Sequence, residues 1–408
     1  MTSRERIVEA LNHREPDILP IDFGGFRSTG ISAIAYRRLK EYLGINDGDI
    51  KLYDVFQQLA EPEPSVLERL GGDVVQLHRY APAYGIAIDK WKTGKLSDGS
   101  DCLVPSEYNP IRNEQGELEI YTGKQLVAKM PTGGLYFDQV FHPYQNVEST
   151  DDIDAIPIDE ITDKELIYLE KEAKRLYETT DKAVFGTFGG SIFETGQLLW
   201  GYEKFFTEMA LNPELVHYWL DKLTGAYMRD LEKYLATVGK YIQVIQFGDD
   251  LGTQEASQIS VDMYREVIKP YQQKQYEFVR NNYPDIKVFL HCCGAISNLI
   301  PDLIDAGVEV LNPVQISAKG MEPSELKRQF GQSLSFWGGG ADMQMSVLSK
   351  EVSEISSDVS ELIRIFSPGG GFVFTQVHNI QANVPPEKIM AIYDTALAMR
   401  GSVYSGNS

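Results

Sequence analysis

The chain has 408 residues, of which 43% are hydrophobic and 24% are charged, and its formal net charge is −21. This composition is typical of a globular protein, and the length suits one large barrel with an insertion or two domains. The negative charge argues against binding to nucleic acid or to an anionic membrane surface, because both would repel the chain.

The cysteine content and the N-terminal segment indicate the cellular compartment in which the protein is expected. Three cysteines in a chain of this length do not form a disulfide framework, and the adjacent Cys292 and Cys293 are badly placed to bond each other. The segment "MTSRERIVEAL" lacks the apolar core of a signal peptide, and the sequence has no apolar run long enough to span a membrane. We therefore expect a reduced, cytoplasmic protein.

Short apolar runs alternate with longer amphipathic stretches along the chain. We predict strands at 17–25, 73–80, 183–190, 242–250, 287–294, 308–315, 334–340 and 372–379. Eight parallel-type strands with helices between them predict a (β/α)8 TIM barrel, formed by residues 1–408 as a single domain. A doubly wound open sheet is the alternative. Residues 84–142 break the alternation with turn signals such as "KLSDGSDC", and we interpret them as a β-rich insertion after the second strand.

Polar residues stand at the ends of nearly all the predicted strands. In TIM barrels the chemistry lies at the C-terminal ends of the strands. The residues at these ends are Arg27, His78, Arg79, Glu194, Asp249, Asp250, His291, Cys292, Cys293, Asn312, Gln315, Asp342, Gln344, Gln376, His378 and Asn379. Solvated loops explain any one of them, but two of the six histidines directly follow apolar runs at this rim.

The segment "KVFLHCCGAIS" places a histidine and two cysteines at the end of the fifth strand. Strand alternation puts His291 and Cys293 on one side and Cys292 on the other. Imidazole and thiolate at this spacing can bind zinc, and a catalytic site needs a third protein ligand and an open position. His378 is the best third ligand by position, with Asp250, Glu194 and Asp342 as substitutes. A buried strand end, with cysteines as small hydrophobic residues, explains the same pattern.

Two further patterns leave alternatives open. The runs "WGGGAD" and "SPGGGF" lack the spacing of a phosphate-binding loop, and tight turns explain them, although the first follows a strand at the predicted active rim. The pair Asp249 and Asp250 either supplies a base or cation ligand or caps the following helix.

The order "FGDDLGTQ", "HCCG", "VLNPVQ", "FWGGGAD" and "PGGGFVFTQVHNIQANVPPEKI" resembles the uroporphyrinogen decarboxylase superfamily, most closely its corrinoid-dependent methyltransferases, including those of anaerobes that demethylate methyl ethers. The resemblance implies a (β/α)8 barrel. Uroporphyrinogen decarboxylases carry Arg-Gln-Ala-Gly-Arg after the first strand to hold substrate carboxylates, whereas this chain reads "GGFRSTGISA" with Arg27 alone, which disfavours porphyrinogen decarboxylation. Zinc-dependent methyltransferases of the superfamily carry His-x-Cys-Gly, matched by residues 291–294. Their third ligand is usually a cysteine near the last strand, where this chain has His378 and Asn379.

The resemblance implies transfer of a methyl group from a small methylated donor, such as a methoxylated aromatic, to the cobalt of a corrinoid. The corrinoid is expected on a partner protein, because the chain has no Asp-x-His-x-x-Gly pattern. We assign zinc to His291, Cys293 and His378, and proton transfer or a fourth ligand position to Asp250 or Glu194. Asn312, Gln315 and Asn379 are expected to orient the substrate. A homodimer is also expected, since superfamily members are often dimers.

Two alternative functions remain. A cofactor-free decarboxylase of a polycarboxylate would need several cationic side chains at the rim, and a non-catalytic barrel that only binds a partner would need no metal.

Overall fold

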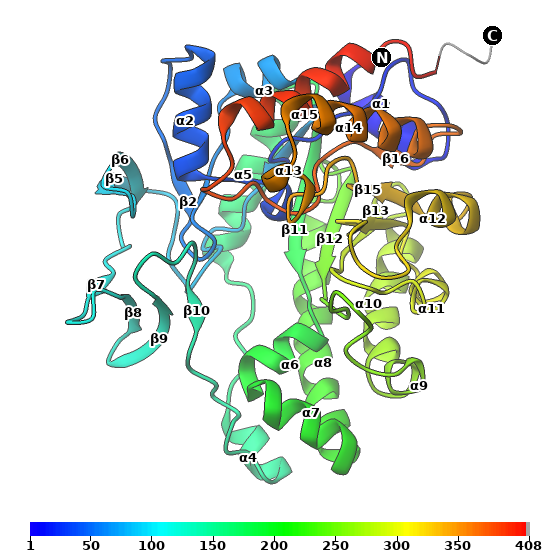
Figure 1. Ribbon diagram of the computed structural model, residues 1–408. Coiled ribbons are helices and arrows are strands. Elements are labelled where there is room, and N and C mark those ends of the chain that lie inside the picture. The colour runs from blue at the N-terminus through cyan, green and yellow to red at the C-terminus, as the bar shows by residue number, and fades with distance from the viewer. Residues whose placement is uncertain (405–408) are drawn as a thin grey trace.

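The computed structural model describes residues 1–404. Its main sheet has seven parallel strands in the order β16-β15-β14-β13-β12-β11-β4. They are β4 (Val74–Leu77), β11 (Ala183–Gly189), β12 (Val244–Gly248), β13 (Lys287–His291), β14 (Val310–Asn312), β15 (Ser335–Trp337) and β16 (Phe372–Val373). Each lies within a predicted strand range, and the strands curl around one axis at the centre of the molecule (Figure 1).

A single residue closes this sheet into a barrel. Ile21 forms a parallel bridge with Phe374 beside β16, and its carbonyl accepts the N–H of Asp73, just before β4, at 2.7 Å. The eighth strand predicted over 17–25 is therefore reduced to one bridge. Pro20 contributes only its carbonyl, which accepts the N–H of Phe374 at 2.9 Å, and Gly24 turns the chain away with φ of +66°. The (β/α)8 barrel predicted from the strand count is confirmed.

Helices surround the barrel and connect successive strands (Figure 1). They are α1 (Ser3–Leu11), α2 (Ala33–Leu43), α3 (Pro64–Leu70), α4 (Thr150–Ala155), α5 (Asp163–Thr179), α6 (Phe193–Trp200), α7 (Tyr202–Leu211), α8 (Pro213–Val238), α9 (Val261–Met263), α10 (Lys269–Asn282), α11 (Ile300–Ala306), α12 (Pro323–Phe330), α13 (Ser346–Ser349), α14 (Val352–Phe366) and α15 (Pro386–Met399). A 3-10 turn η1 (Arg27–Thr29) and a π-helical turn η2 (Tyr264–Ile268) complete the helical elements. No helix within residues 1–404 is both long and apolar enough to cross a membrane.

Aromatic side chains fill the inside of the barrel. Phe26 stacks on Phe185 with 4.7 Å between ring centroids, and Phe289 and Trp337 meet these rings edge to face. Ile7 from α1 belongs to the same buried cluster, so α1 packs across the N-terminal end of the strands. Because this end and the interior are filled, open space for a ligand is left at the C-terminal ends.

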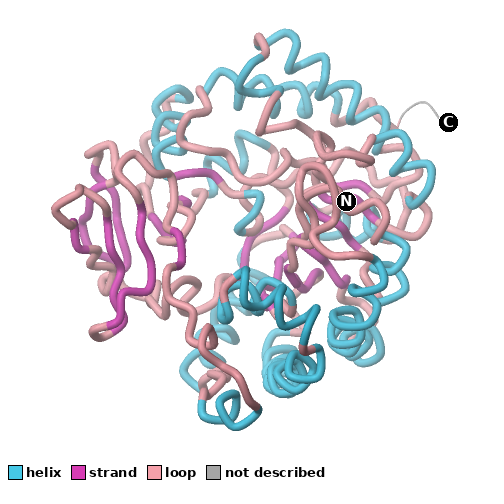
Figure 2. Tube along the Cα trace, turned by 60° about the horizontal axis from the view of Figure 1, so that its bottom comes forward, coloured by secondary structure: helices cyan, strands magenta, loops and turns pink. Residues whose placement is uncertain are grey.

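Antiparallel strands lie outside the barrel in two groups. The first is a three-stranded sheet of β1 (Ile31–Ser32), β2 (Leu52–Asp54) and β3 (Leu59–Ala60). The second lies between β4 and β11 and comprises β5 (Trp91–Lys95), β6 (Asp101–Pro105), β7 (Ile111–Arg112), β8 (Leu118–Thr122), β9 (Gln125–Met130) and β10 (Asp138–Gln139). Strands β7 to β10 stand beside the barrel (Figure 2). Phe137 anchors them, since its ring is fully buried and its N–H donates to the carbonyl of Phe56 at 2.9 Å.

Candidate metal and substrate site

Three potential metal ligands meet at the C-terminal ends of the barrel strands. His291 is the last residue of β13, Cys293 follows two residues later, and His378 follows β16. One ligand atom from each lies within 4.8 Å of the others, and Cys293 Sγ is 3.4 Å from His291 Nε2. Cys292 lies on the opposite side, where its buried sulfur accepts the N–H of Leu251. The structure thus brings together the three residues predicted to bind zinc.

The ring of His291 is held in one orientation by a neighbouring strand. Asn312 pairs with His291 in the parallel register of β13 and β14. Its Oδ1 lies 2.6 Å from His291 Nδ1, and its Nδ2 donates to the carbonyl of Trp337 at 2.7 Å, which fixes Oδ1 as the acceptor. His291 Nδ1 therefore carries the proton, and the lone pair of Nε2 faces Cys293 and His378. Asn312 is fully buried with both amide atoms paired, so it positions His291, whereas the sequence predicted contact with substrate.

His378 is held in an unusual backbone conformation. Its φ of +61° lies in the left-handed region, which residues other than glycine rarely adopt. Such conformations are often found at functional sites. Its Nδ1 lies 2.8 Å from Oδ1 of Asn379, and Asn379 Nδ2 donates to Gln57 Oε1 at 2.9 Å. Burial, aided by the nearby His291, lowers the pKa of His378 to about 4. The ring is therefore neutral at physiological pH, which is the form that binds metal.

The backbone around Cys293 is fixed by contacts with two other loops. The N–H of Cys293 donates to Asp250 Oδ1 at 2.7 Å, and the N–H of Gly294 donates to Gln315 Oε1 at 2.8 Å. A Cβ on Gly294 would lie 2.4 Å from the backbone of Gly252, so these two loops touch along their main chains. Burial and the Asp250 carboxylate raise the pKa of the Cys293 thiol. A bound cation would reverse this effect, because metals deprotonate coordinating thiols.

Asp249, Asp250 and Glu194 form a group of interacting carboxyl side chains at this end of the barrel, and Asp250 contacts the ligand trio. Asp249 is buried and accepts the N–H groups of Ile192, Phe193 and Glu194, so it caps the start of α6, which precedes it in the chain. The sequence alternative of a cap on the following helix is wrong, because Ser260 caps that helix, α9. Burial raises its pKa to about 7. Asp250 Oδ1 lies 3.8 Å from His291 Nε2.

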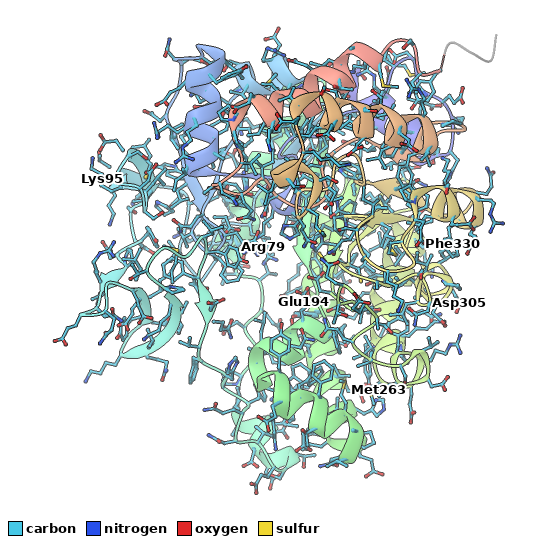
Figure 3. The ribbon with its side chains drawn as sticks, viewed as in Figure 1. Arg79, Lys95, Glu194, Met263, Asp305 and Phe330 are labelled. Atoms are coloured by element: carbon cyan, nitrogen blue, oxygen red, sulfur yellow. The ribbon has the colours of Figure 1, made fainter. Side chains whose placement is uncertain are left out.

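Glu194 stands in the first turn of α6 (Figure 3). Burial, followed by the charges of Asp250 and Asp249, raises its pKa well above that of an ordinary glutamate. This environment favours the protonated form of the carboxyl group over the carboxylate.

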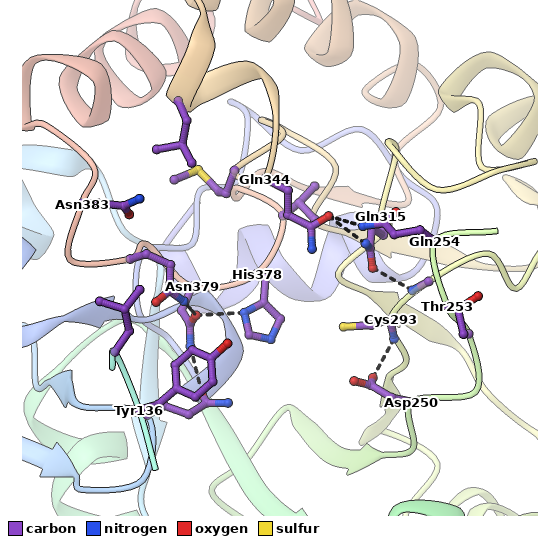
Figure 4. Close-up of a pocket in the computed structure, with 18 of the residues that line it drawn as sticks. Tyr136, Asp250, Thr253, Gln254, Cys293, Gln315, Gln344, His378, Asn379 and Asn383 are labelled. Carbon is purple, nitrogen blue, oxygen red and sulfur yellow. Dashed lines mark hydrogen bonds between the residues drawn. The ribbon is translucent and has the colours of Figure 1, made fainter. Parts of the chain in front are cut away.

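A cavity of about 600 Å³ opens beside the ligand trio, and Figure 4 shows the Cys293 and His378 side chains at its wall. This volume is within the range of small-molecule sites. Asp250, Gln315 and Asn379 line it as predicted, together with Gln344. Leu135 and Tyr136, which precede β10, also line it. That this segment reaches the cavity could not be predicted, because no pattern in the sequence indicates where an irregular insertion packs.

Other predicted rim residues lie apart from the cavity. His78 packs against Tyr53, with 4.3 Å between ring centroids, and Arg79 forms an ion pair with Glu165. Asp342, considered as a substitute ligand, accepts the N–H groups of Gln344 and Ser346 at the start of α13. Of the sixteen predicted rim residues, His78, Arg79 and Asp342 are therefore not part of the cavity wall.

Comparisons with known proteins show the family and the fold of the chain. Residues 138–398 match the uroporphyrinogen decarboxylase (URO-D) family. The chain belongs to this family. Uroporphyrinogen decarboxylase of Pelodictyon phaeoclathratiforme is 23% identical over 191 residues, 46% of this chain and 50% of that protein. The chain thus spans half the length of that relative, whereas the match to uroporphyrinogen decarboxylase of Crocosphaera subtropica, 21% identical, covers 86% of this chain and 96% of that protein. A solved methyltransferase from Methanosarcina mazei superposes with a TM-score of 0.62 at 16% identity, covering 98% and 99% of the two chains, which shows a shared fold.

The cavity of this URO-D family member contains little positive charge. Among its described lining residues none is a lysine or an arginine. Arg27, which follows the first barrel segment, forms an ion pair of 2.5 Å with the fully buried carboxylate of Asp54. The same carboxylate accepts the N–H groups of Phe56 and Gln57 at 2.9 Å. Arg27 is thereby engaged in holding a loop.

Proposed function

We propose that this chain is a methyltransferase that moves a methyl group from a small methylated donor, such as a methyl ether, to the cobalt of a corrinoid carried by a partner protein. The observation that carries the proposal is the convergence of His291, Cys293 and His378 within 4.8 Å beside a cavity without cationic lining residues. The shared fold with the Methanosarcina mazei methyltransferase supports the reaction class. The absence of cationic lining residues disfavours a decarboxylase of polycarboxylates, which must neutralise several carboxylates.

The ligand trio fits zinc in chemistry and in number. Two imidazoles and one thiolate match the ligands of catalytic zinc sites, which keep one position open for substrate. Each imidazole has its Nδ1 next to an asparagine oxygen, the outer contact that orients zinc-bound histidines. Zinc in this position would act as a Lewis acid on the donor oxygen.

The side chains of this chain supply the proton that the reaction requires. When the methyl carbon passes to cobalt, its bond to oxygen breaks and the electron pair stays on that oxygen, which then takes up a proton. The raised pKa of Glu194 favours its protonated form, and we assign it the role of acid. Asp250 holds the Cys293 backbone and faces His291 Nε2, so it is assigned to positioning these groups and to a fourth ligand position.

The mouth of the cavity is suited to a protein partner. Three exposed apolar side chains line it on elements from distant parts of the sequence, which are Leu135, Tyr136 and Leu348. Exposed apolar groups of this kind mark interaction surfaces. We propose that the corrinoid protein binds here, so that its cobalt faces the donor.

Metal analysis of the purified protein tests the proposal. We expect close to stoichiometric zinc in the wild type, loss of zinc in Cys293→Ser, and full zinc in Cys102→Ser, whose thiol lies in β6 far from the trio. Mixing the wild type with cob(I)alamin and methyl ethers should produce the spectrum of methylcobalamin, and Cys293→Ser should not. Wild-type protein that binds no zinc and methylates no cobalamin would refute the proposal.

A further inference from the structure

Uncharged amide groups form most of the polar wall of the cavity. Seven of its nineteen lining residues are glutamine or asparagine. Asp250 is the one carboxylate among these described residues, and its Oδ1 already accepts the N–H of Cys293. Apart from the metal ligands and Asp250, the described wall therefore offers neutral hydrogen-bonding groups and no lysine or arginine.

Several of these amides have groups left for a ligand. Gln344 Oε1 accepts from both Gln254 and Gln315, while its own Nε2 has no partner within residues 1–404. Gln57 Oε1 accepts from Asn379, and its Nε2 is likewise unpaired in the described chain. The side chain of Asn383 also forms no hydrogen bond there. All three residues line the cavity, and Figure 4 shows the side chains of Gln344 and Asn383 on different parts of its wall.

The charges at this wall favour a neutral ligand over an anionic or a cationic one. With the methoxy oxygen of the donor at the zinc position, a carboxylate elsewhere on the ring would lose water without meeting a cationic side chain, and it would lie in the same cavity as the carboxylate of Asp250. The nearby Arg27 is paired with Asp54 and adds no free positive charge. A cationic ligand would find one carboxylate, Asp250, which already accepts a backbone N–H and faces His291. A neutral ligand oxygen can accept a hydrogen bond from an unpaired amide N–H, and it needs no side chain of opposite charge.

We propose that the methyl donor is an uncharged methoxylated phenol that carries hydroxyl groups and no carboxylate. This inference rests on the proposed function. Phe56, Leu135 and Tyr136 supply an apolar wall for the ring, and 47% of the Tyr136 surface is exposed. The amides of Gln57, Gln344 and Asn383 bind the ring substituents.

Calorimetric binding of three matched compounds tests this inference with the zinc-loaded protein. Vanillyl alcohol, vanillate and vanillylamine share one methoxyphenol ring and differ only in a neutral, anionic or cationic substituent. We expect vanillyl alcohol to bind about tenfold more tightly than either charged analogue. Equal or tighter binding of vanillate or vanillylamine, or no binding of any of the three, would overturn the inference.

Charge variants provide a second measurement. Gln344→Lys should tighten vanillate binding about fivefold or more, because it adds the missing cation to the wall, whereas Gln329→Lys on the exposed face of α12 should leave it unchanged. Asn383→Lys serves the same purpose if Gln344→Lys fails to fold. No gain for vanillate in a folded variant counts against the inference. Methyl transfer to cob(I)alamin is measured separately: the expected binding order without transfer refutes the proposed function alone, and transfer with vanillate as the best ligand refutes the inference alone.

Discussion

Replacing Asn312 by alanine should weaken zinc binding although Asn312 offers no metal ligand itself. Its Oδ1 lies 2.6 Å from His291 Nδ1, and its Nδ2 is 2.7 Å from the carbonyl of Trp337. Outer contacts of this kind contribute about 10- to 100-fold to metal affinity. This range corresponds to about 1.4 to 2.8 kcal/mol, because each tenfold change in affinity is about 1.4 kcal/mol.

The same substitution should also lower the stability of the metal-free protein. Alanine leaves the ring nitrogen of His291 and the Trp337 carbonyl unpaired at a fully buried position. Each of the two unsatisfied groups costs about 1 to 3 kcal/mol, so a loss of about 2 to 6 kcal/mol in the free energy of unfolding is expected.

Competition with a zinc chelator measures the affinity, and urea unfolding measures the stability. Asn298→Ala is the control, since Asn298 is exposed and its side chain bonds, among the residues that the structure describes, only the hydroxyl of Ser257. If Asn312→Ala retains zinc within about twofold of the wild type while His291→Ala loses it, the orienting role of Asn312 is refuted.

Two further predictions concern stability. Gly294→Ala should destabilise the fold by about 3 kcal/mol or more, because its φ is +94° and a Cβ would lie 2.4 Å from the backbone of Gly252, whereas Gly225→Ala within α8 should stabilise by up to about 1 kcal/mol. Asp22 is fully buried, and burial raises its pKa to about 6, so the stability that it contributes is complete below pH ~4 and is lost as the pH rises through 6. Between pH 4 and 7 the free energy of unfolding of the wild type, relative to Asp22→Asn, should fall by about 3 kcal/mol.

Urea unfolding at a series of pH values checks both predictions. Equal stability of Gly294→Ala and wild type would mean that the contact between residues 252 and 294 gives way without cost. A difference between wild type and Asp22→Asn that stays constant with pH would mean that Asp22 remains ionised in the folded state, held by the N–H of Gly25, the hydroxyl of Thr29 and the indole of Trp337.

The sequence predicted the barrel well because its strands are buried and its helices amphipathic, and both leave a periodic pattern. Alternation alone placed His291 and Cys293 on one side of β13. The role of Asn312 was out of reach, since it depends on the register between β13 and β14, which a single sequence does not contain. The position of Tyr136 in the cavity wall was not predicted, because an irregular segment has no periodic sequence pattern from which its packing could be inferred. The first strand was predicted too long, since apolar residues around Pro20 resemble a strand although Ile21 alone forms a bridge.

The seam at Ile21 and Phe374 also constrains how the protein is made. Residues separated by more than 300 positions must meet before the cylinder exists, and such distant pairings form slowly. Until the last strand has left the ribosome, β15 and the Ile21 segment lack their common partner, and the aromatic interior is uncovered on that side. The growing chain is therefore expected to depend on chaperones, and a change at the seam would reduce yield in cells more than activity of the finished molecule.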